Sequence, residues 1–135
     1  MNQENTQKLL DDFPEMFFED GRGPNKTSTM HNNLIYCGDG WFDILYNLCK
    51  EISPMRAKVM QIKEKFGGLR FYCSFPKDYS EKGYKFIREA ESEAYKTCEQ
   101  CGQPGEMRIR SGWRMLKCDQ CWEQHKMEHP EEPYP

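Results

Sequence analysis

The chain has 135 residues, of which 37% are hydrophobic and 13% aromatic, and its formal net charge is −3. The length suits one compact domain, or a small domain followed by a segment that a metal ion stabilises. The negative charge argues against a nonspecific nucleic-acid binder, which is usually basic overall. The N-terminus has no apolar run that suits a signal peptide, and no stretch approaches the roughly 18 apolar residues of a membrane span, so we expect a cytoplasmic protein.

The first part of the chain is predicted to contain two helices separated by a loop. A short helix is expected over residues 4–12, and glycine, proline and polar residues over 19–33 indicate the loop. Asp39 is predicted to cap a second helix, which should end at Ser53-Pro54. Apolar residues that recur at helical spacing along it are expected to form its buried face: Phe42, Leu45, Tyr46, Leu48, Cys49 and Ile52.

Two strands joined by a glycine turn are predicted next. Residues 57–63 and 69–75 both alternate between apolar and polar side chains, which is typical of strands with one buried face. In the first strand the alternation would place Met60 and Ile62 on the same face. Because Phe66-Gly67-Gly68 lies between the strands, we expect an antiparallel hairpin.

A third helix is predicted from Asp78 or Ser80 to about Lys96, running directly into the last part of the chain. Its buried face is expected to use Tyr84, Ile87, Ala90, Ala94 and Tyr95. We therefore divide the chain into an α+β core (1–97), a zinc finger (98–128) and an acidic, proline-rich tail (129–135) that is expected to be disordered or loosely held.

The strongest motif is two Cys-x-x-Cys pairs, Cys98/Cys101 and Cys118/Cys121. Two such pairs at this separation predict a tetrahedral site for one zinc ion. Four sulfurs close the coordination sphere, so the ion should be structural and not catalytic. Disulfides are rare in the cytoplasm, so the other cysteines are expected to be free thiols: Cys37, Cys49 and Cys73.

The residues around the second pair predict a hairpin and a helix. Residues 106–110 and 113–117 should pair around Ser111-Gly112, and residues 122–128 should be helical. Gly102 follows the first pair, where a positive φ is often needed. The order is that of a treble-clef-like finger, with a zinc ribbon as the close alternative. The predicted fold class is therefore α+β: a small antiparallel hairpin or sheet, two or three helices, and a C-terminal four-cysteine finger packed against them.

The segment CEQCGQPGEMRIRSGWRMLKCDQCWEQHK resembles the zinc finger of the DksA/TraR family of RNA-polymerase-binding regulators. The resemblance is specific at the cysteines and Gly102 and covers the finger alone. Those regulators carry their acidic working residues at the tip of a long helical hairpin, whereas this chain is predicted to have one helix before the finger and strands in place of its partner. The resemblance therefore implies the finger and not the regulatory activity.

A second resemblance covers more of the chain. The segments GWFDILYNLCKEI, QIKEKFGGLRFYC and CEQCGQPGEMRIRSGWRMLKCDQC are similar to a group of small uncharacterised proteins of bacteriophages and prophages, with KEKFGGLRFY (63–72) as the specific string. This resemblance implies a phage-associated origin. It implies no particular activity.

Two basic hairpins are candidate partner-binding surfaces. On the finger, the cations Arg108, Arg110, Arg114 and Lys117 surround Trp113. They predict either a face for phosphate or an acidic partner, or a solvated hairpin in which Trp113 covers the metal site, which is the favoured role of Trp113. The other hairpin is either a protruding binding surface or a sheet edge whose lysines deter aggregation, and its candidate residues are Lys63, Lys65, Phe66, Arg70 and Tyr72.

Three functions follow as hypotheses. The first is a phage-associated, non-enzymatic binding protein that engages a host or phage protein complex, with inhibition of a host-defence complex as one form. The second is a nucleic-acid-binding or RNA-polymerase-associated module using the finger and residues 53–75, where five bases face one acid. The third is a small metal-dependent nuclease, because His31-Asn32-Asn33 resembles the His-Asn sites of such enzymes, although no histidine lies between Cys101 and Cys118.

Overall fold

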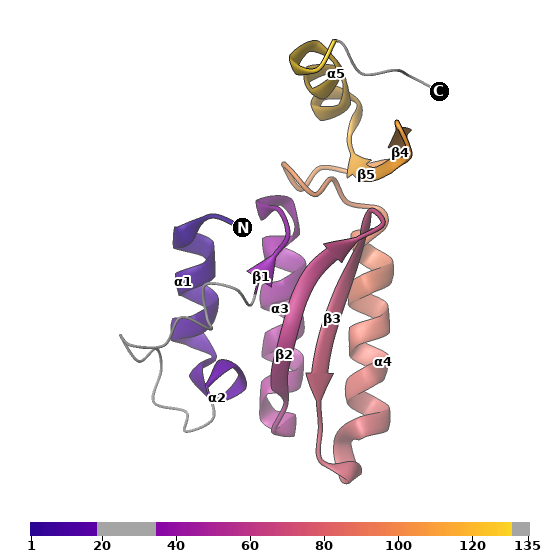
Figure 1. The fold of residues 1–135 in the computed structure, drawn as a ribbon. Helices are drawn as coiled ribbons and strands as arrows, with labels where there is room; N and C mark the ends of the chain where they lie inside the picture. Colours follow the sequence, from indigo (N-terminus) through magenta and orange to yellow (C-terminus); the bar gives the residue numbers. More distant parts are fainter. Residues whose placement is uncertain (19–34, 131–135) are drawn as a thin grey trace.

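The chain folds as an α+β protein, as the sequence predicts, with helices behind a small sheet and a further hairpin and helix at one end (Figure 1). The computed structural model describes residues 1–18 and 35–130. The loop predicted over 19–33 and residues 131–135 of the predicted tail lie outside the described residues. Among the helices it describes, none is both long enough and apolar enough to cross a membrane.

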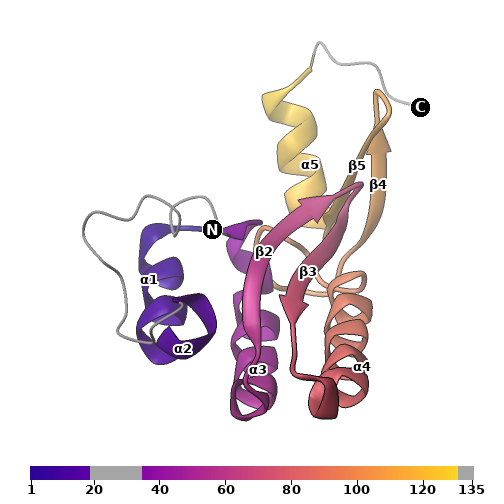
Figure 2. The same ribbon diagram turned by 60° about the horizontal axis from the view of Figure 1, so that its bottom comes forward.

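The N-terminal residues form α1 (Gln3–Asp12), as predicted, and the single-turn α2 (Pro14–Phe17). Asn2 caps α1, because its side chain accepts a hydrogen bond from Asn5 N at 2.7 Å. The sequence did not predict α2, which begins at a proline, a residue favoured at the first position of a helix because it needs no N–H partner there. The two helices lie beside the sheet at its β1 side (Figure 2).

The second predicted helix begins as a 3₁₀ turn, η2 (Asp39–Trp41), continues as α3 (Phe42–Ile52) and is followed by η3 (Ser53–Met55). The prediction that Asp39 caps this helix is wrong. Its carboxylate instead accepts hydrogen bonds from Asn2 N and Asn5 Nδ2, at 2.7 and 3.1 Å, and so ties α1 to the start of η2. The predicted apolar stripe is buried at Leu45, Leu48, Cys49 and Ile52.

The sheet contains β1 (Ile35–Tyr36), β2 (Lys58–Lys65) and β3 (Gly68–Ser74) in that order. β1 pairs parallel to β2, and β2 pairs antiparallel to β3, which confirms the predicted hairpin. Phe66 and Gly67 form its turn with φ values of 55° and 85°. Two consecutive positive φ angles are what a two-residue hairpin turn needs to match the twist of its strands, which explains the glycine.

Because β2 contains a β-bulge, its side chains lie on different faces of the sheet from those that the sequence predicts. The register shifts between Val59 and Gln61, so Met60 is the additional residue. Met60 is 66% exposed whereas Ile62 is fully buried, so the prediction that they share a face is wrong. An extra residue reverses the alternation, and hydrophobic periodicity alone does not show it. β3 keeps its predicted alternation, with these side chains buried: Leu69, Phe71 and Cys73.

The inner face of the sheet is covered by α3 and α4 (Lys77–Ala94) (Figures 1 and 2). Ile87 and Ala94 are buried as predicted, but the prediction is wrong for Tyr84 and Tyr95, which are 41% and 42% exposed. Gly83 of α4 packs closely against Phe75, the residue after β3, since a Cβ at Gly83 would lie 2.4 Å from the Phe75 ring. The helix therefore uses a glycine for this contact. A search for large apolar residues at helical spacing does not find such a contact.

One apolar core joins these elements, with the fully buried Trp41 among its largest side chains. The three cysteines outside the paired motifs belong to this core and are free thiols. Burial is the main cause that raises the pKa of Cys37 and of Cys73 to about 12, so these thiols stay protonated at neutral pH. They act as small apolar residues in the core.

Candidate metal centre

The C-terminal segment has the predicted hairpin, β4 (Glu106–Arg110) and β5 (Trp113–Lys117), followed by α5 (Asp119–Glu128). Ser111 and Gly112 form its turn, with φ values of 52° and 82°. The helix begins earlier than predicted because Cys118 caps it, its Sγ accepting a hydrogen bond from Cys121 N at 3.4 Å. The second cysteine pair therefore lies at a helix start, which is the treble-clef order and not that of a ribbon.

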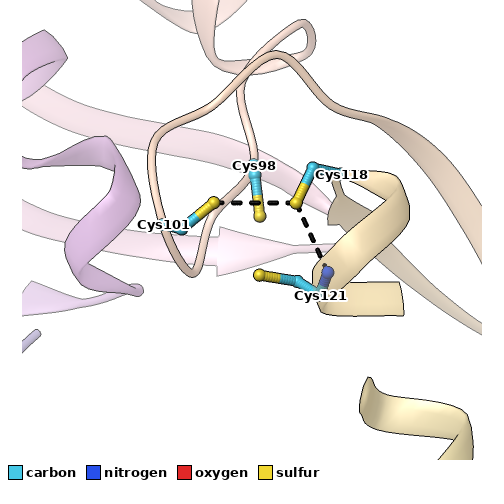
Figure 3. Close-up of side chains that lie close together, drawn as sticks. All are labelled: Cys98, Cys101, Cys118 and Cys121. Atoms are coloured by element: carbon cyan, nitrogen blue, oxygen red, sulfur yellow. Dashed lines mark hydrogen bonds between the residues drawn. The ribbon is translucent and has the colours of Figure 1, made fainter. Parts of the chain in front are cut away.

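The sulfur atoms of Cys98, Cys101, Cys118 and Cys121 converge on one point, as Figure 3 shows. All four lie within 4.8 Å of one another, and those of Cys101 and Cys118 are 3.6 Å apart. Four sulfurs held at about 2.3 Å around a tetrahedral zinc ion would lie about 3.8 Å from each other. A disulfide would need about 2.05 Å, so the 3.6 Å separation is that of two ligands and not of a bond. The four cysteines are positioned to hold one metal ion.

The first pair is held by a tight backbone turn. Gly102 has the predicted positive φ, at 84°, and its N–H donates to Cys98 O at 3.0 Å. Cys98 N donates to Gln103 O at 2.7 Å, which fixes the backbone that carries the first ligand. Cys98 and Cys121 are buried, Cys118 is half-buried and Cys101 is exposed, so the site lies under the surface with one ligand facing solvent.

The surroundings of the sulfurs affect their ionisation in opposite directions. Burial opposes ionisation of Cys98, but backbone N–H groups of Cys118, Cys101 and Gln100 outweigh it and lower the pKa of this thiol to about 7. Burial, together with the neighbouring sulfurs, raises the pKa of Cys121. A bound cation would stabilise all four thiolates, since metal binding releases the thiol protons.

The segment is attached to the rest of the protein through the residues that open the second helix. Gly40 N donates to Glu99 O at 2.7 Å, and Gly38 N donates to the Glu99 carboxylate at 2.8 Å. The Trp41 indole donates to Thr97 O at 3.0 Å. A Cβ at Gly40 would lie 2.1 Å from Cys98 O, so glycine is required for this close approach. Leu116 of β5 is fully buried in the common core, which confirms that the finger packs against the α+β part.

Two of the predicted partner-binding arginines hold the segment together. Arg108 is half-buried, and its guanidinium contacts Glu106 at 3.2 Å and Asp119 at 2.5 Å. Arg110 is fully buried and donates to His129 O, the carbonyl that follows the last turn of α5. A guanidinium at a helix C-terminus binds its unpaired carbonyls and opposes the helix dipole. Arg110 thus lies inside the finger, and its predicted place on an exposed hairpin is wrong.

The rest of that hairpin is more accessible. Arg114 is exposed, and Lys117 donates to Gln100 Oε1 at 2.8 Å. Trp113 is 75% exposed, so the prediction that it covers the metal site is wrong. Ile109, which the sequence did not single out, is 47% exposed beside Arg114, its partner in the register of β4 and β5.

The two candidate hairpins touch each other. A Cβ at Gly67, in the turn between β2 and β3, would lie 2.6 Å from Met107 Sδ and 3.2 Å from the carbonyl carbon of Arg114. Beside this contact lie four exposed residues, which we call the tip surface: Lys65, Phe66, Ile109 and Arg114. The other candidates, Lys63, Arg70 and Tyr72, point from the sheet on the side away from α3 and α4.

No protein-family model, curated protein or solved structure matches this chain. His31, the histidine of the nuclease hypothesis, lies outside the described residues. Within the part of the chain that the structure describes, the four cysteines are the one cluster of potential metal ligands.

Proposed function

We propose that this protein is a non-enzymatic binding protein in which one structural zinc ion holds the β4–β5 hairpin against the β2–β3 turn, so that the tip surface can bind a partner protein. The observation that carries the proposal is the contact of Gly67 with Met107 and Arg114, which joins two hairpins from distant parts of the chain into one surface.

The choice of zinc rests on the donor set. Four thiolates in two Cys-x-x-Cys pairs, at separations that fit a tetrahedron, are the usual ligands of structural zinc. Such a site has no open position for water or substrate, and this supports a role in folding over one in catalysis. The segment has few buried apolar residues. Binding of the ion would supply the free energy of folding that a larger apolar core supplies in other domains.

The composition of the tip surface supports protein binding. Phe66 is 66% exposed and Ile109 is 47% exposed, and both lie beside the cations Lys65 and Arg114. Exposed aromatic side chains next to arginine are typical of the residues that dominate binding energy in protein interfaces. Both hairpins are fixed by the core or by the metal site, so little conformational entropy would be lost on binding.

The partner is proposed to be a protein complex of a phage or of its bacterial host. This part of the proposal rests on the similarity of residues 63–72 and the finger to phage and prophage proteins. Inhibition of the host complex, including a defence complex, is the proposed form of its action.

The test is affinity capture from bacterial host lysate with the wild-type chain and with Phe66→Ala, followed by quantitative mass spectrometry. The matched control is Tyr79→Ala, which removes another exposed aromatic side chain, 40% exposed, from the first turns of α4. We expect a protein enriched by the wild type and by Tyr79→Ala but lost with Phe66→Ala. Capture of no protein, or equal capture by all three chains, would overturn the proposal.

A further inference from the structure

The side of the sheet that faces away from α3 and α4 carries tyrosines and cations. In Figures 1 and 2 the two helices lie behind β2 and β3, and no described helix covers the other side of these strands. We call this side the outward sheet face, and it contains Tyr36, Gln61, Lys63, Arg70 and Tyr72. It is distinct from the tip surface, which lies beyond the end of the same hairpin.

The strand register places three of these residues in one row. Tyr36 of β1 pairs with Lys63 of β2, and Lys63 pairs with Arg70 of β3. Beyond β3, Arg70 Nη1 donates a long hydrogen bond, of 3.5 Å, to the OH of Tyr95, the residue after α4. Two adjacent cations are therefore bracketed by two tyrosines, which are 51% and 42% exposed.

The next row adds a third ring. Tyr72 lies opposite Gln61, two residues from Arg70 along β3, and is 42% exposed. Lys63 Nζ lies 5.6 Å from the centre of the Tyr72 ring, which places a cation and an aromatic face side by side. The spacing of neighbouring strands, about 4.8 Å, lets rings and cations on adjacent strands act on one extended ligand.

The fold alone does not explain the cations. Like charges directly opposite each other across two strands destabilise the pair. Among the described residues, no carboxylate lies within ion-pair distance of Lys63 or Arg70, and Glu91, the acid whose charge acts on Arg70, already accepts a hydrogen bond from Phe71 N at 2.9 Å. An anionic ligand would relieve the repulsion between Lys63 and Arg70.

We propose that the outward sheet face binds single-stranded nucleic acid, with Lys63 and Arg70 on phosphates and Tyr72 and Tyr36 stacked on bases. Aromatic rings beside cations on an open sheet suit unpaired bases, because every base has a face that can stack and a duplex hides those faces. An acidic protein could contact both the cations and the rings, so the experiment includes polyglutamate as a competitor to separate the two ligands.

The distribution of charge on the rest of the molecule is compatible with this ligand. The net charge of −3 is not spread evenly, since a groove between α3 and α4, on the far side of these helices from the sheet, is lined by four carboxylates: Asp43, Glu51, Glu89 and Glu93. Phosphates would be attracted to the sheet side and repelled from the helix side, which orients a strand on one face.

The experiment is fluorescence anisotropy with a labelled 15-nucleotide oligothymidylate, titrated with the metal-loaded full chain at several salt concentrations. Removing the stacked ring in Tyr72→Leu should weaken binding by roughly 5- to 150-fold, whereas Tyr72→Phe should stay within about 2-fold of wild type. Lys63→Ala should weaken binding and flatten the slope of log K against log salt by about 0.7, the value for one phosphate contact on a single strand. Lys85→Ala, an exposed cation on α4, is the matched control and should change neither.

Several results would overturn the proposal. Equal affinity for a duplex of the same length, equal loss in Tyr72→Phe and Tyr72→Leu, or competition by polyglutamate as strong as that by unlabelled oligothymidylate would each do so. Absence of measurable binding at 50 mM salt would do so as well. Phe66→Ala should leave oligonucleotide binding unchanged. The nucleic-acid proposal can therefore be overturned while the proposed protein-binding function stands, and the protein-binding function can be overturned while the nucleic-acid proposal stands.

Discussion

The body of the protein and its C-terminal segment are stabilised by different means. From residue 1 to the end of α4, buried apolar side chains of α1, α3, the sheet and α4 form one core. From Cys98 to His129, the main apolar contribution to that core is Leu116, and the other buried residues are two cysteines of the metal site and Arg110. The first region can bury enough apolar surface to fold, whereas the second depends on ligands and hydrogen bonds.

This difference determines what keeps each of the two proposed binding surfaces rigid. The outward sheet face belongs to the body and should persist without metal. The tip surface takes Lys65 and Phe66 from the body but Ile109 and Arg114 from the segment, so it should exist only while the metal site is intact. The two surfaces can therefore be separated by removing the metal.

The largest expected effect comes from removing a ligand. Cys98→Ser should abolish metal binding and unfold residues 98–129, because apparent binding free energies of structural zinc sites are about 10–16 kcal/mol. Native mass spectrometry should show one zinc per wild-type chain and none in the variant. Cys49→Ser, at a buried cysteine outside the cluster, is the control and should keep its zinc; a folded, metal-free segment in Cys98→Ser would contradict the account.

The next largest effect is expected at the joint between the two regions. Gly40→Ala would place a methyl group 2.1 Å from Cys98 O, and overpacking of this kind costs about 1–3 kcal/mol. Thermal unfolding should show the loss.

The matched control for this joint is Gly112→Ala, where nothing lies within 4 Å and the cost is that of the positive φ of 82° alone. If Gly40→Ala melted at the wild-type temperature, the segment would not be docked on the body through this contact.

An effect of similar size should distinguish two arginines of one hairpin. Arg110→Ala should destabilise the segment by about 2–3 kcal/mol, because it removes a buried charged hydrogen-bond donor and leaves a cavity beneath α5. Arg114→Ala should change stability by less than about 0.5 kcal/mol, since that side chain is exposed. Chemical denaturation followed by the tryptophan signal measures both, and equal losses would contradict the buried position of Arg110.

These arginines also show what the sequence could predict. The cysteine spacing predicted the ligands because the geometry of zinc leaves few alternatives, and the glycine turns predicted both hairpins. Arg110 and Arg114 are equivalent in the sequence, four residues apart on a basic hairpin. Arg110 is buried and contacts the carbonyl of His129 at the end of α5, and no local pattern encodes that contact. The bulge at Met60 and the packing of α4 through Gly83 escaped prediction for the same reason.

The smallest effect is expected in the body, at Asp12. Its hydrogen bond from Tyr46 OH, 2.6 Å long, together with Lys8, lowers the pKa of this carboxyl, so its charged form favours the folded state. Asp12→Asn should lower the melting temperature slightly at neutral pH. The difference from wild type should fade as the pH falls below about 4, through the lowered pKa, because the carboxyl is then protonated in both states. A difference that does not change with pH would contradict the assignment.

Hydrogen exchange measured by mass spectrometry, on the wild-type chain before and after treatment with a zinc chelator, tests the central claim most directly. Amides of β4, β5 and α5 are expected to lose protection after chelation, while those of α3, β2 and β3 keep it. Loss of protection in both regions together, or in neither, would contradict the claim that metal holds the segment and apolar packing holds the body.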